Sequence, residues 1–126
     1  MTYSQCAWIG NHLNILVLGP MGGGKSFVAC SLGTAAIRLG YSVRYFRTSR
    51  LLHALAQARQ DASYPNLLRS LARTDLLILD DWMRDELTPV NAQDILEVLD
   101  DRYGQAATIV ASQMPVTVRF HRNTHP

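Results

Sequence analysis

The sequence contains few cysteines and no long apolar run, and each absence excludes a class of protein. The two cysteines, Cys6 and Cys30, fit no zinc-ligand spacing, so we expect two reduced thiols in a cytosolic protein. No apolar run approaches the length of a membrane span. The N-terminus lacks the basic-then-apolar order of a signal peptide. These absences predict a cytoplasmic protein that has no membrane partner.

A strong charge imbalance is missing as well. The formal net charge is +2 and the pI is about 8.7, well short of the basic character that indicates nucleic-acid binding by itself. Arg44, Arg47 and Arg50 come nearest to a basic cluster, but the odd spacing of the first two places them on opposite faces of a strand. We therefore expect a solvated basic face, and any DNA binding should be weak and not sequence-specific.

The order of apolar segments predicts an α/β fold in a single domain. Short apolar runs at residues 14–18, 42–47, 76–79 and 108–112 are typical of strands, and helical patterns lie between them at 25–39, 50–59, 65–72 and 89–103. Strands that alternate with helices indicate a parallel sheet with right-handed crossovers. Such sheets bind ligands at the carboxyl ends of their strands, which is where the sequence places Gly19, Asp80 and Gln113.

Local signals predict the ends and the buried faces of the helices. Ser49 is expected to cap the second helix, and Thr88 the fourth, before a proline at its first position. Gly40 and Gly104 follow the first and fourth helices, where a positive φ is tolerated. Apolar spacing predicts the buried stripes of these two helices. The stripes are Val28, Leu32, Ala35 and Leu39 on the first helix, and Leu96, Leu99 and Tyr103 on the last.

A phosphate-binding loop follows the first predicted strand. Residues 19–26, GPMGGGKS, fit the Walker A pattern G-x-x-x-x-G-K-[ST] in full. Glycines let the backbone turn its N–H groups towards an anion, and the next helix adds its N-terminal N–H groups. Lys25 is expected to reach the β- and γ-phosphates and Ser26 to ligate Mg²⁺, which predicts binding of ATP with magnesium. The expected nucleotide contacts are Gly19, Pro20, Met21, Gly22, Gly23, Gly24, Lys25, Ser26 and Phe27.

Polar residues at two later strand ends complete the predicted site. Asp80 can hold the magnesium ion together with Ser26, usually through water, and Asp81 can polarise the attacking water of an ATPase. Gln113 can touch the γ-phosphate or orient that water. The catalytic residues of a hydrolase would then be Lys25, Asp81 and Gln113. Two alternatives remain open: Asp81 could be a solvated acid, and Gln113 could be an ordinary polar loop residue.

Five segments in this order and spacing resemble a known family. They are GPMGGGKS, AAIRLGYSVRYFR, LARTDLLILDDW, LTPVNAQDILEVLDDRYG and TIVASQMPV. Over residues 7–116 the chain resembles the IstB-like ATPases, helpers of insertion-sequence transposition that are similar to DnaC helicase loaders. The resemblance implies a P-loop NTPase of the AAA+ type, with a five-stranded three-layer α/β/α core, self-assembly on DNA and a transposase partner. By position it implies Lys25 and Ser26 as the Walker A pair, Asp80 and Asp81 as the Walker B acids, and Gln113 at the sensor 1 place.

The sequence departs from the family pattern at both ends. Few residues precede the first strand, and the closing TVRFHRNTHP does not match the fifth strand, sensor 2 or arginine finger of the family. We expect residues 1–116 to form an incomplete core with four of the usual five strands, and 117–126 to be an irregular tail from a truncated or frameshifted gene copy. Nucleotide binding would be kept, hydrolysis slow and self-assembly impaired. The alternatives are a non-hydrolysing nucleotide-binding remnant and a small-molecule kinase, although the arginine cluster of a kinase lid is missing.

Overall fold

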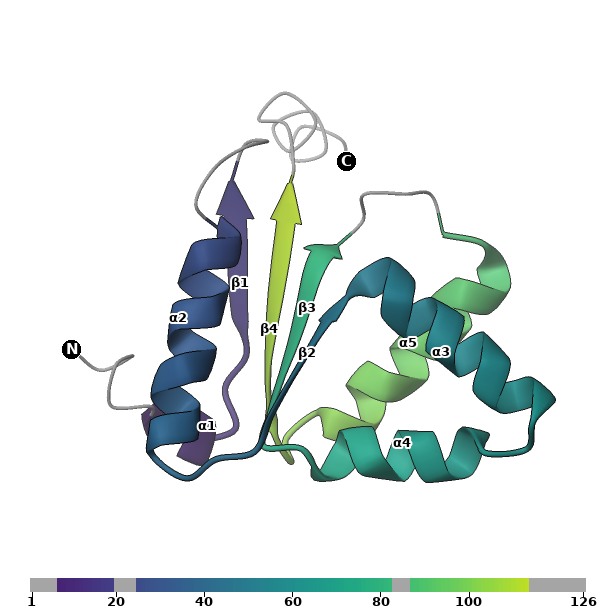
Figure 1. The fold of residues 1–126 in the computed structure, drawn as a ribbon, viewed down its shortest axis with the longest axis horizontal. Helices are drawn as coiled ribbons and strands as arrows, with labels where there is room; N and C mark the ends of the chain where they lie inside the picture. The colour runs from purple at the N-terminus through teal and green to yellow at the C-terminus, as the bar shows by residue number, and fades with distance from the viewer. Residues whose placement is uncertain (1–6, 20–24, 83–86, 114–126) are drawn as a thin grey trace, which may run out of the picture.

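The computed structural model describes residues 7–19, 25–82 and 87–113, and its helices and strands alternate along the chain (Figure 1). All predicted strands and helices are present, and one short helix, α1, was not predicted. The elements in order are α1 (Ala7–Gly10), β1 (Ile15–Gly19), α2 (Lys25–Arg38), β2 (Val43–Arg47), α3 (Thr48–Gln60), α4 (Tyr64–Arg73), β3 (Leu76–Trp82), α5 (Pro89–Arg102) and β4 (Ala107–Gln113).

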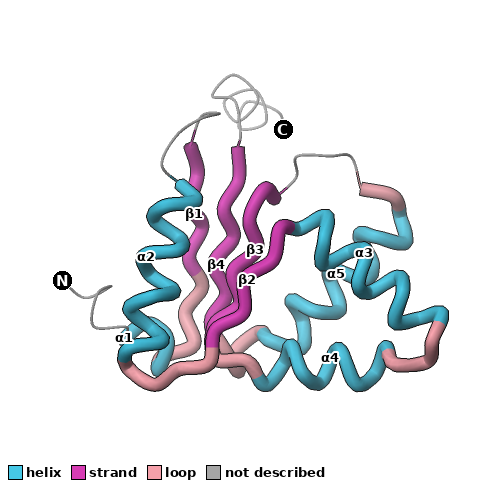
Figure 2. The backbone as a smooth tube through the Cα atoms, viewed as in Figure 1, coloured by secondary structure: helices cyan, strands magenta, loops and turns pink. Residues whose placement is uncertain are grey.

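The four strands form one parallel sheet with the order β1-β4-β3-β2. Figure 2 shows α2 beside one face of the sheet and α3, α4 and α5 on the other side. The central strand β3 is buried on both faces, because Leu76 and Ile78 pack with α2 while Leu77 and Leu79 pack with α3 and α5. This is the three-layer α/β/α arrangement with a parallel sheet that the sequence predicts.

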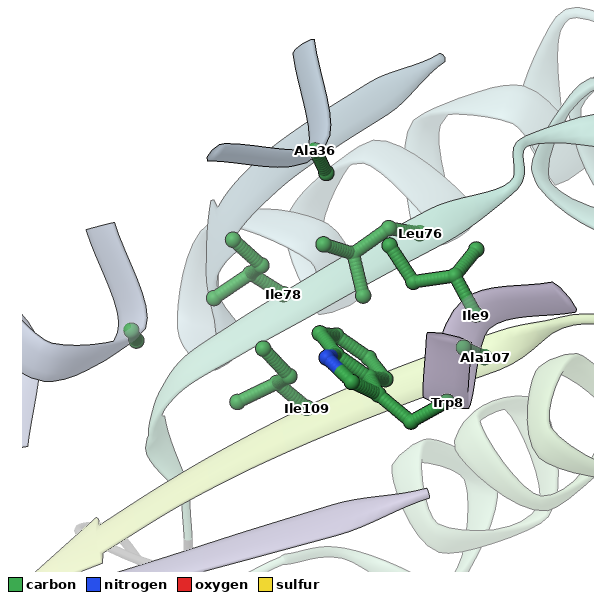
Figure 3. Packing of buried hydrophobic residues seen from close by; sticks show 8 residues of the cluster. Trp8, Ile9, Ala36, Leu76, Ile78, Ala107 and Ile109 are labelled. Atoms are coloured by element: carbon green, nitrogen blue, oxygen red, sulfur yellow. The ribbon is translucent and has the colours of Figure 1, made fainter. Parts of the chain in front are cut away.

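Helix α2 packs against the sheet mainly through small residues, so the predicted apolar stripe on this helix is correct only for Leu32 and Ala35, which pack against the core. Ala29 and Ala36 are fully buried, whereas Val28 and Leu39 are about half exposed. A Cβ added to Gly33 would lie only 2.9 Å from Cδ1 of Ile78, so the helix backbone approaches the strand closely. Figure 3 shows Ala36 in this core with the buried side chains of α1, β3 and β4. Small side chains occupy the buried face of α2 because they allow the helix backbone to approach the sheet closely.

Helix α5 also turns a face to the core that its apolar spacing predicted only in part, because Leu99 alone of the predicted stripe packs against the core. Leu96 and Tyr103 are exposed, and Asp94 and Arg102 are buried with the apolar residues of the helix. Asp94 is paired with Arg59 of α3, whose Nη2 lies 2.6 Å from the Asp94 Oδ1. A charged side chain can be buried when it is paired and hydrogen-bonded, and these partners are distant in the sequence.

Arg102 joins the ends of three elements inside the protein. Its Nε donates to Oγ1 of Thr108 at 2.9 Å, and its two Nη atoms donate to the carbonyl oxygens of Leu71, Thr74 and Ala107. Burial lowers the pKa of Arg102 to about 10, although the negative charge of Asp75 acts to raise it. The guanidinium group is therefore still protonated at neutral pH. Arg102 therefore ties the C-terminus of α4 to the first residues of β4.

The helix ends agree with the sequence except at α3. Thr88 caps α5, and its Oγ1 accepts a hydrogen bond from the Asn91 amide at 3.1 Å. Gly40 and Gly104 have φ values of 90° and 72°, as predicted. Ser49 does not cap α3, because the helix already begins at Thr48. Within the described ranges, no helix is long and apolar enough to cross a membrane.

Candidate functional site

The predicted site residues that the structure describes at strand ends lie at one edge of the sheet, where the strands end. Gly19 and Gln113 are the last residues of β1 and β4 and are paired in register. Asp80 and Asp81 lie in the last three residues of β3, and Asp80 is paired with Arg47 at the end of β2. The strands are parallel, and the arrows of Figure 1 point towards this edge. The structure thus places the strand-end residues as the sequence predicts, while their roles remain predictions.

The predicted phosphate loop lies between the end of a strand and the start of a helix. Gly19 ends β1 and Lys25 begins α2. Residues 20–24 lie outside the described residues, as do the side chains of Lys25, Ser26, Phe27 and Gln113. The backbone on either side has the geometry that an anion site uses, because a helix N-terminus presents unpaired N–H groups and the positive end of the helix dipole.

Asp80 has a buried carboxylate on the α2 side of the sheet. Its residue exposure is only 3%, and it lies two positions after Ile78, which packs against α2. One carboxylate oxygen accepts a hydrogen bond from the Tyr45 hydroxyl, and the other accepts the Asp81 amide at 2.8 Å. The Thr48 hydroxyl donates to the carbonyl oxygen of Asp80 at 2.9 Å. Contacts from β2 and α3 therefore fix both the backbone and the side chain of this acid.

Asp81 has a different backbone conformation from its neighbour. Its φ is 52°, in the left-handed region that is uncommon for a residue other than glycine. The pairing of β3 with β4 shifts between Leu79 and Trp82, which is a bulge that re-aims the side chain at this point. Nε of the exposed Arg47 lies 3.8 Å from Oδ2 of Asp81. Arg47 is thus a neighbour of the predicted catalytic acid that the sequence did not reveal.

Tyr45 is the second residue of this region that sequence reasoning missed. Burial raises the pKa of its phenol, and the hydrogen bond to Asp80 and the charge of that carboxylate raise the pKa further. The hydroxyl is therefore protonated at neutral pH and available as a donor. The strand pairing would have been the signal, because Tyr45 lies opposite Ile78 and so on the same face as Asp80.

The donor set at this edge fits a magnesium ion better than a metal held by protein ligands alone. Among the residues that the structure describes, no group of three or more histidines, cysteines or acids could enclose a metal. Magnesium keeps several waters and is usually bound by one or two carboxylates and the phosphates of a substrate. A single buried carboxylate, Asp80, near the N-terminus of α2 has that chemistry.

A cavity of about 400 Å³ lies apart from these residues, against β1, β4 and α5. Apolar side chains dominate its wall, including Leu16, Trp82 and Leu99, with Arg102 and Tyr103 beside them. Asp80 and Asp81, the predicted site residues whose side chains the structure describes, do not line this cavity. The polar strand ends and the cavity are therefore separate features of the molecule.

Comparison with protein families finds one family over almost the whole chain. The model described as "IstB-like ATP binding protein" matches residues 1–121. The "Putative insertion sequence ATP-binding protein y4pL" of Sinorhizobium fredii is 48% identical over 110 residues, which is 87% of this chain and 45% of that protein. The "Insertion sequence IS1162 putative ATP-binding protein" of Pseudomonas fluorescens is 45% identical over 125 residues, 99% of this chain and 54% of that protein. The chain spans about half the length of these relatives.

Solved structures share the fold at low sequence identity. The crystal structure of the DnaC helicase loader has a TM-score of 0.80 and 18% identity, and the match covers 95% of this chain and 73% of that one. Replication initiator DnaA bound to AMPPCP and single-stranded DNA has a TM-score of 0.78 and 19% identity, over 88% of this chain and 36% of that one. These neighbours are P-loop proteins of the AAA+ type, which confirms the predicted fold class.

Proposed function

The chain belongs to the IstB-like ATP-binding protein family, and on that premise we propose that it binds ATP with magnesium as a module of an insertion-sequence transposition helper. One observation carries the proposal. The buried Asp80 carboxylate lies on the α2 side of the sheet, at the edge where β1 ends in Gly19 and α2 begins with Lys25. Asp80 and the N-terminus of α2 therefore lie on the same face of the sheet, at the carboxyl ends of the strands.

The triphosphate is held by the loop from Gly19 to Ser26 and by the first turn of α2. A polyphosphate needs many donors at close range, and the backbone N–H groups of a glycine-rich loop and a helix N-terminus provide them. Lys25 adds a positive charge for the β- and γ-phosphates, and Phe27 continues the contact surface into the helix. The charge-assisted hydrogen bond from Lys25 is among the strongest single contacts of such a site.

Magnesium is held by the Ser26 hydroxyl and the Asp80 carboxylate. When bound, the ion neutralises charge on the β- and γ-phosphate oxygens. Asp80 would hold the ion indirectly, by accepting hydrogen bonds from the water molecules around it. The hydrogen bonds from Tyr45 and the Asp81 amide orient its carboxylate for this role.

Hydrolysis, where it occurs, uses Asp81 to polarise the attacking water and Gln113 to orient it. Phosphoryl transfer depends on positioning and on cations that neutralise charge on the γ-phosphate. Lys25 and magnesium supply part of that charge, so we expect slow turnover in the isolated chain. The second candidate function is nucleotide binding without hydrolysis, and the contact between Asp81 and Arg47 favours it because this contact engages the proposed base.

The proposed partners beyond ATP are DNA and a transposase. The names of the relatives place them in insertion sequences, and the DnaA neighbour is described with single-stranded DNA bound. With a net charge of only +2, the chain should bind DNA through a few phosphate contacts that salt weakens steeply. An anisotropy titration on random duplex DNA at low and near-physiological salt tests this.

Titration with a fluorescent ATP analogue tests the proposed function. Lys25→Ala should weaken binding at least about tenfold, because it removes a charge-assisted contact to phosphate. Arg38→Ala is the matched control, since Arg38 is an exposed cation at the other end of α2 and should leave affinity unchanged. Equal affinity in Lys25→Ala and the parent would contradict the proposal.

A further inference from the structure

The Tyr45 side chain crosses from β2 to the acid that ends β3. The strand register pairs Tyr45 with Ile78 and Arg47 with Asp80, so the contact between Tyr45 and Asp80 is diagonal. Ile78 and Asp80 lie on one face of the sheet because they are two residues apart. Tyr45, opposite Ile78, lies on that same face, and a long aromatic side chain reaches a diagonal neighbour.

This face of the sheet is the one that packs against α2. Ile78 packs with Ala29 and Ala36 of α2. Helix α2 therefore packs on the face of the sheet to which Asp80 and Tyr45 belong.

The two described hydrogen bonds to the Asp80 carboxylate have different origins. The Asp81 amide is part of the chain next to Asp80, so it moves with the acid. The Tyr45 hydroxyl comes from a neighbouring strand and is attached to a separate part of the sheet. A carboxylate oxygen has two lone pairs, so a hydrogen bond from Tyr45 to one of them fixes the direction of the other.

We propose that Tyr45 is a positioning residue for magnesium, whose hydroxyl holds the Asp80 carboxylate in the orientation that receives the hydrated ion. The inference rests on the proposed function and names one further residue in it. Tyr45 contacts neither the nucleotide nor the ion and acts only through Asp80. The side chain suits this role because 43% exposure leaves its ring at the rim of the site while its hydroxyl reaches the buried acid.

The test is the magnesium dependence of nucleotide binding in Tyr45→Phe, which removes the hydroxyl and keeps the ring. Binding of a fluorescent ATP analogue is titrated with MgCl₂ and is also measured in EDTA. The Mg²⁺ concentration for half-maximal binding should rise roughly tenfold, which corresponds to a lost hydrogen bond to a charged group. Binding in EDTA should stay at the parental level. Tyr103→Phe is the control, because Tyr103 is exposed and lies beside the separate cavity. It should change neither the magnesium dependence nor the binding in EDTA.

A double-mutant cycle separates positioning from general support of the fold. In an Asp80→Asn background, Tyr45→Phe should no longer change the magnesium dependence, because the acid through which it acts is gone. Thermal melting without magnesium reports any loss of folding in each variant. An unchanged magnesium dependence in Tyr45→Phe, or an equal loss of binding with and without magnesium, would overturn the inference and leave the proposed function standing. A parent protein that binds no nucleotide would overturn both.

Discussion

Buried charged groups lie both where the parallel strands begin and where they end, and the two groups have different roles. At the amino edge, where the strands begin, Arg102 is enclosed by a side-chain hydroxyl and by backbone carbonyls from α4, from the loop that follows α4 and from β4. At the carboxyl edge, Asp80 accepts hydrogen bonds beside a strand bulge and the start of α2. Burial of a charge alone therefore does not identify a site. Position at the carboxyl ends of parallel strands is the additional criterion.

The amino edge is also closed by reciprocal hydrogen bonds between neighbouring strands. The Asp75 carboxylate accepts from the amide of Ser42 at 2.9 Å and from its hydroxyl, and the Ser42 hydroxyl accepts from the Asp75 amide. The Asn14 side chain accepts from the Thr108 amide at 3.0 Å. These contacts fix the strand starts relative to one another. The comparison predicts that changes at the amino edge lower stability, whereas changes at the carboxyl edge alter ligand binding.

The largest expected effect is at Arg102. Arg102→Met removes all its hydrogen bonds and leaves several buried carbonyl groups without this donor, so the free energy of unfolding should fall by about 3 kcal/mol. Urea denaturation followed by circular dichroism measures the loss. Arg73→Met, an exposed arginine at the end of α4, is the control and should change stability little. A loss below about 1 kcal/mol for Arg102→Met would contradict its structural role.

The next effect distinguishes the two neighbouring acids at the carboxyl edge. Asp80→Asn should raise the Mg²⁺ concentration for half-maximal ATP binding by about tenfold, because the charge near the ion is lost. Asp81→Asn should leave binding close to the parental level and lower any turnover, since it alters the proposed base and spares the metal. Titration of both variants with MgCl₂ and a steady-state phosphate-release assay check this. Equal loss of binding in the two variants would show that the roles are assigned incorrectly.

The smallest effect is expected at the amino edge, between Ser42 and Asp75. Asp75→Asn keeps the shape of the side chain but weakens acceptance of two hydrogen bonds from Ser42, so the free energy of unfolding should fall by about 1 kcal/mol. Affinity for the ATP analogue should be unchanged, because the residue is at the opposite end of the strands. A change in the free energy of nucleotide binding larger than the change in the free energy of unfolding would contradict the claim that the amino edge affects only stability.

The strands and the strand-end residues were predictable because each depends on local sequence. The apolar run before Asp80 gives a strand that is buried on both faces, and the Thr88-Pro89 pair gives a helix start. The buried faces of α2 and α5 were only partly predictable from apolar spacing. Gly33 matters through its approach to Ile78, and Asp94 is buried because of Arg59, a residue 35 positions away. Both facts depend on contacts that only the folded chain brings together.

The finer geometry of the site was likewise beyond the sequence. The contact of Tyr45 with Asp80 follows from the register of β2 and β3, which no local pattern determines. The left-handed conformation of Asp81 depends on the bulge between β3 and β4. The sequence could therefore name the residues of the carboxyl edge, but it could not say which neighbours hold them.

Covalent labelling of Lys25 is the most direct test of ATP binding at this edge, because Lys25 is the only lysine in the sequence. An acyl-phosphate derivative of ATP transfers its acyl group to an amine that lies beside the phosphates, and peptide mapping by mass spectrometry distinguishes Lys25 from the N-terminal amine. The account predicts labelling at Lys25 that excess ATP with magnesium suppresses. Absence of labelling at Lys25, or labelling that ATP does not suppress, would contradict it.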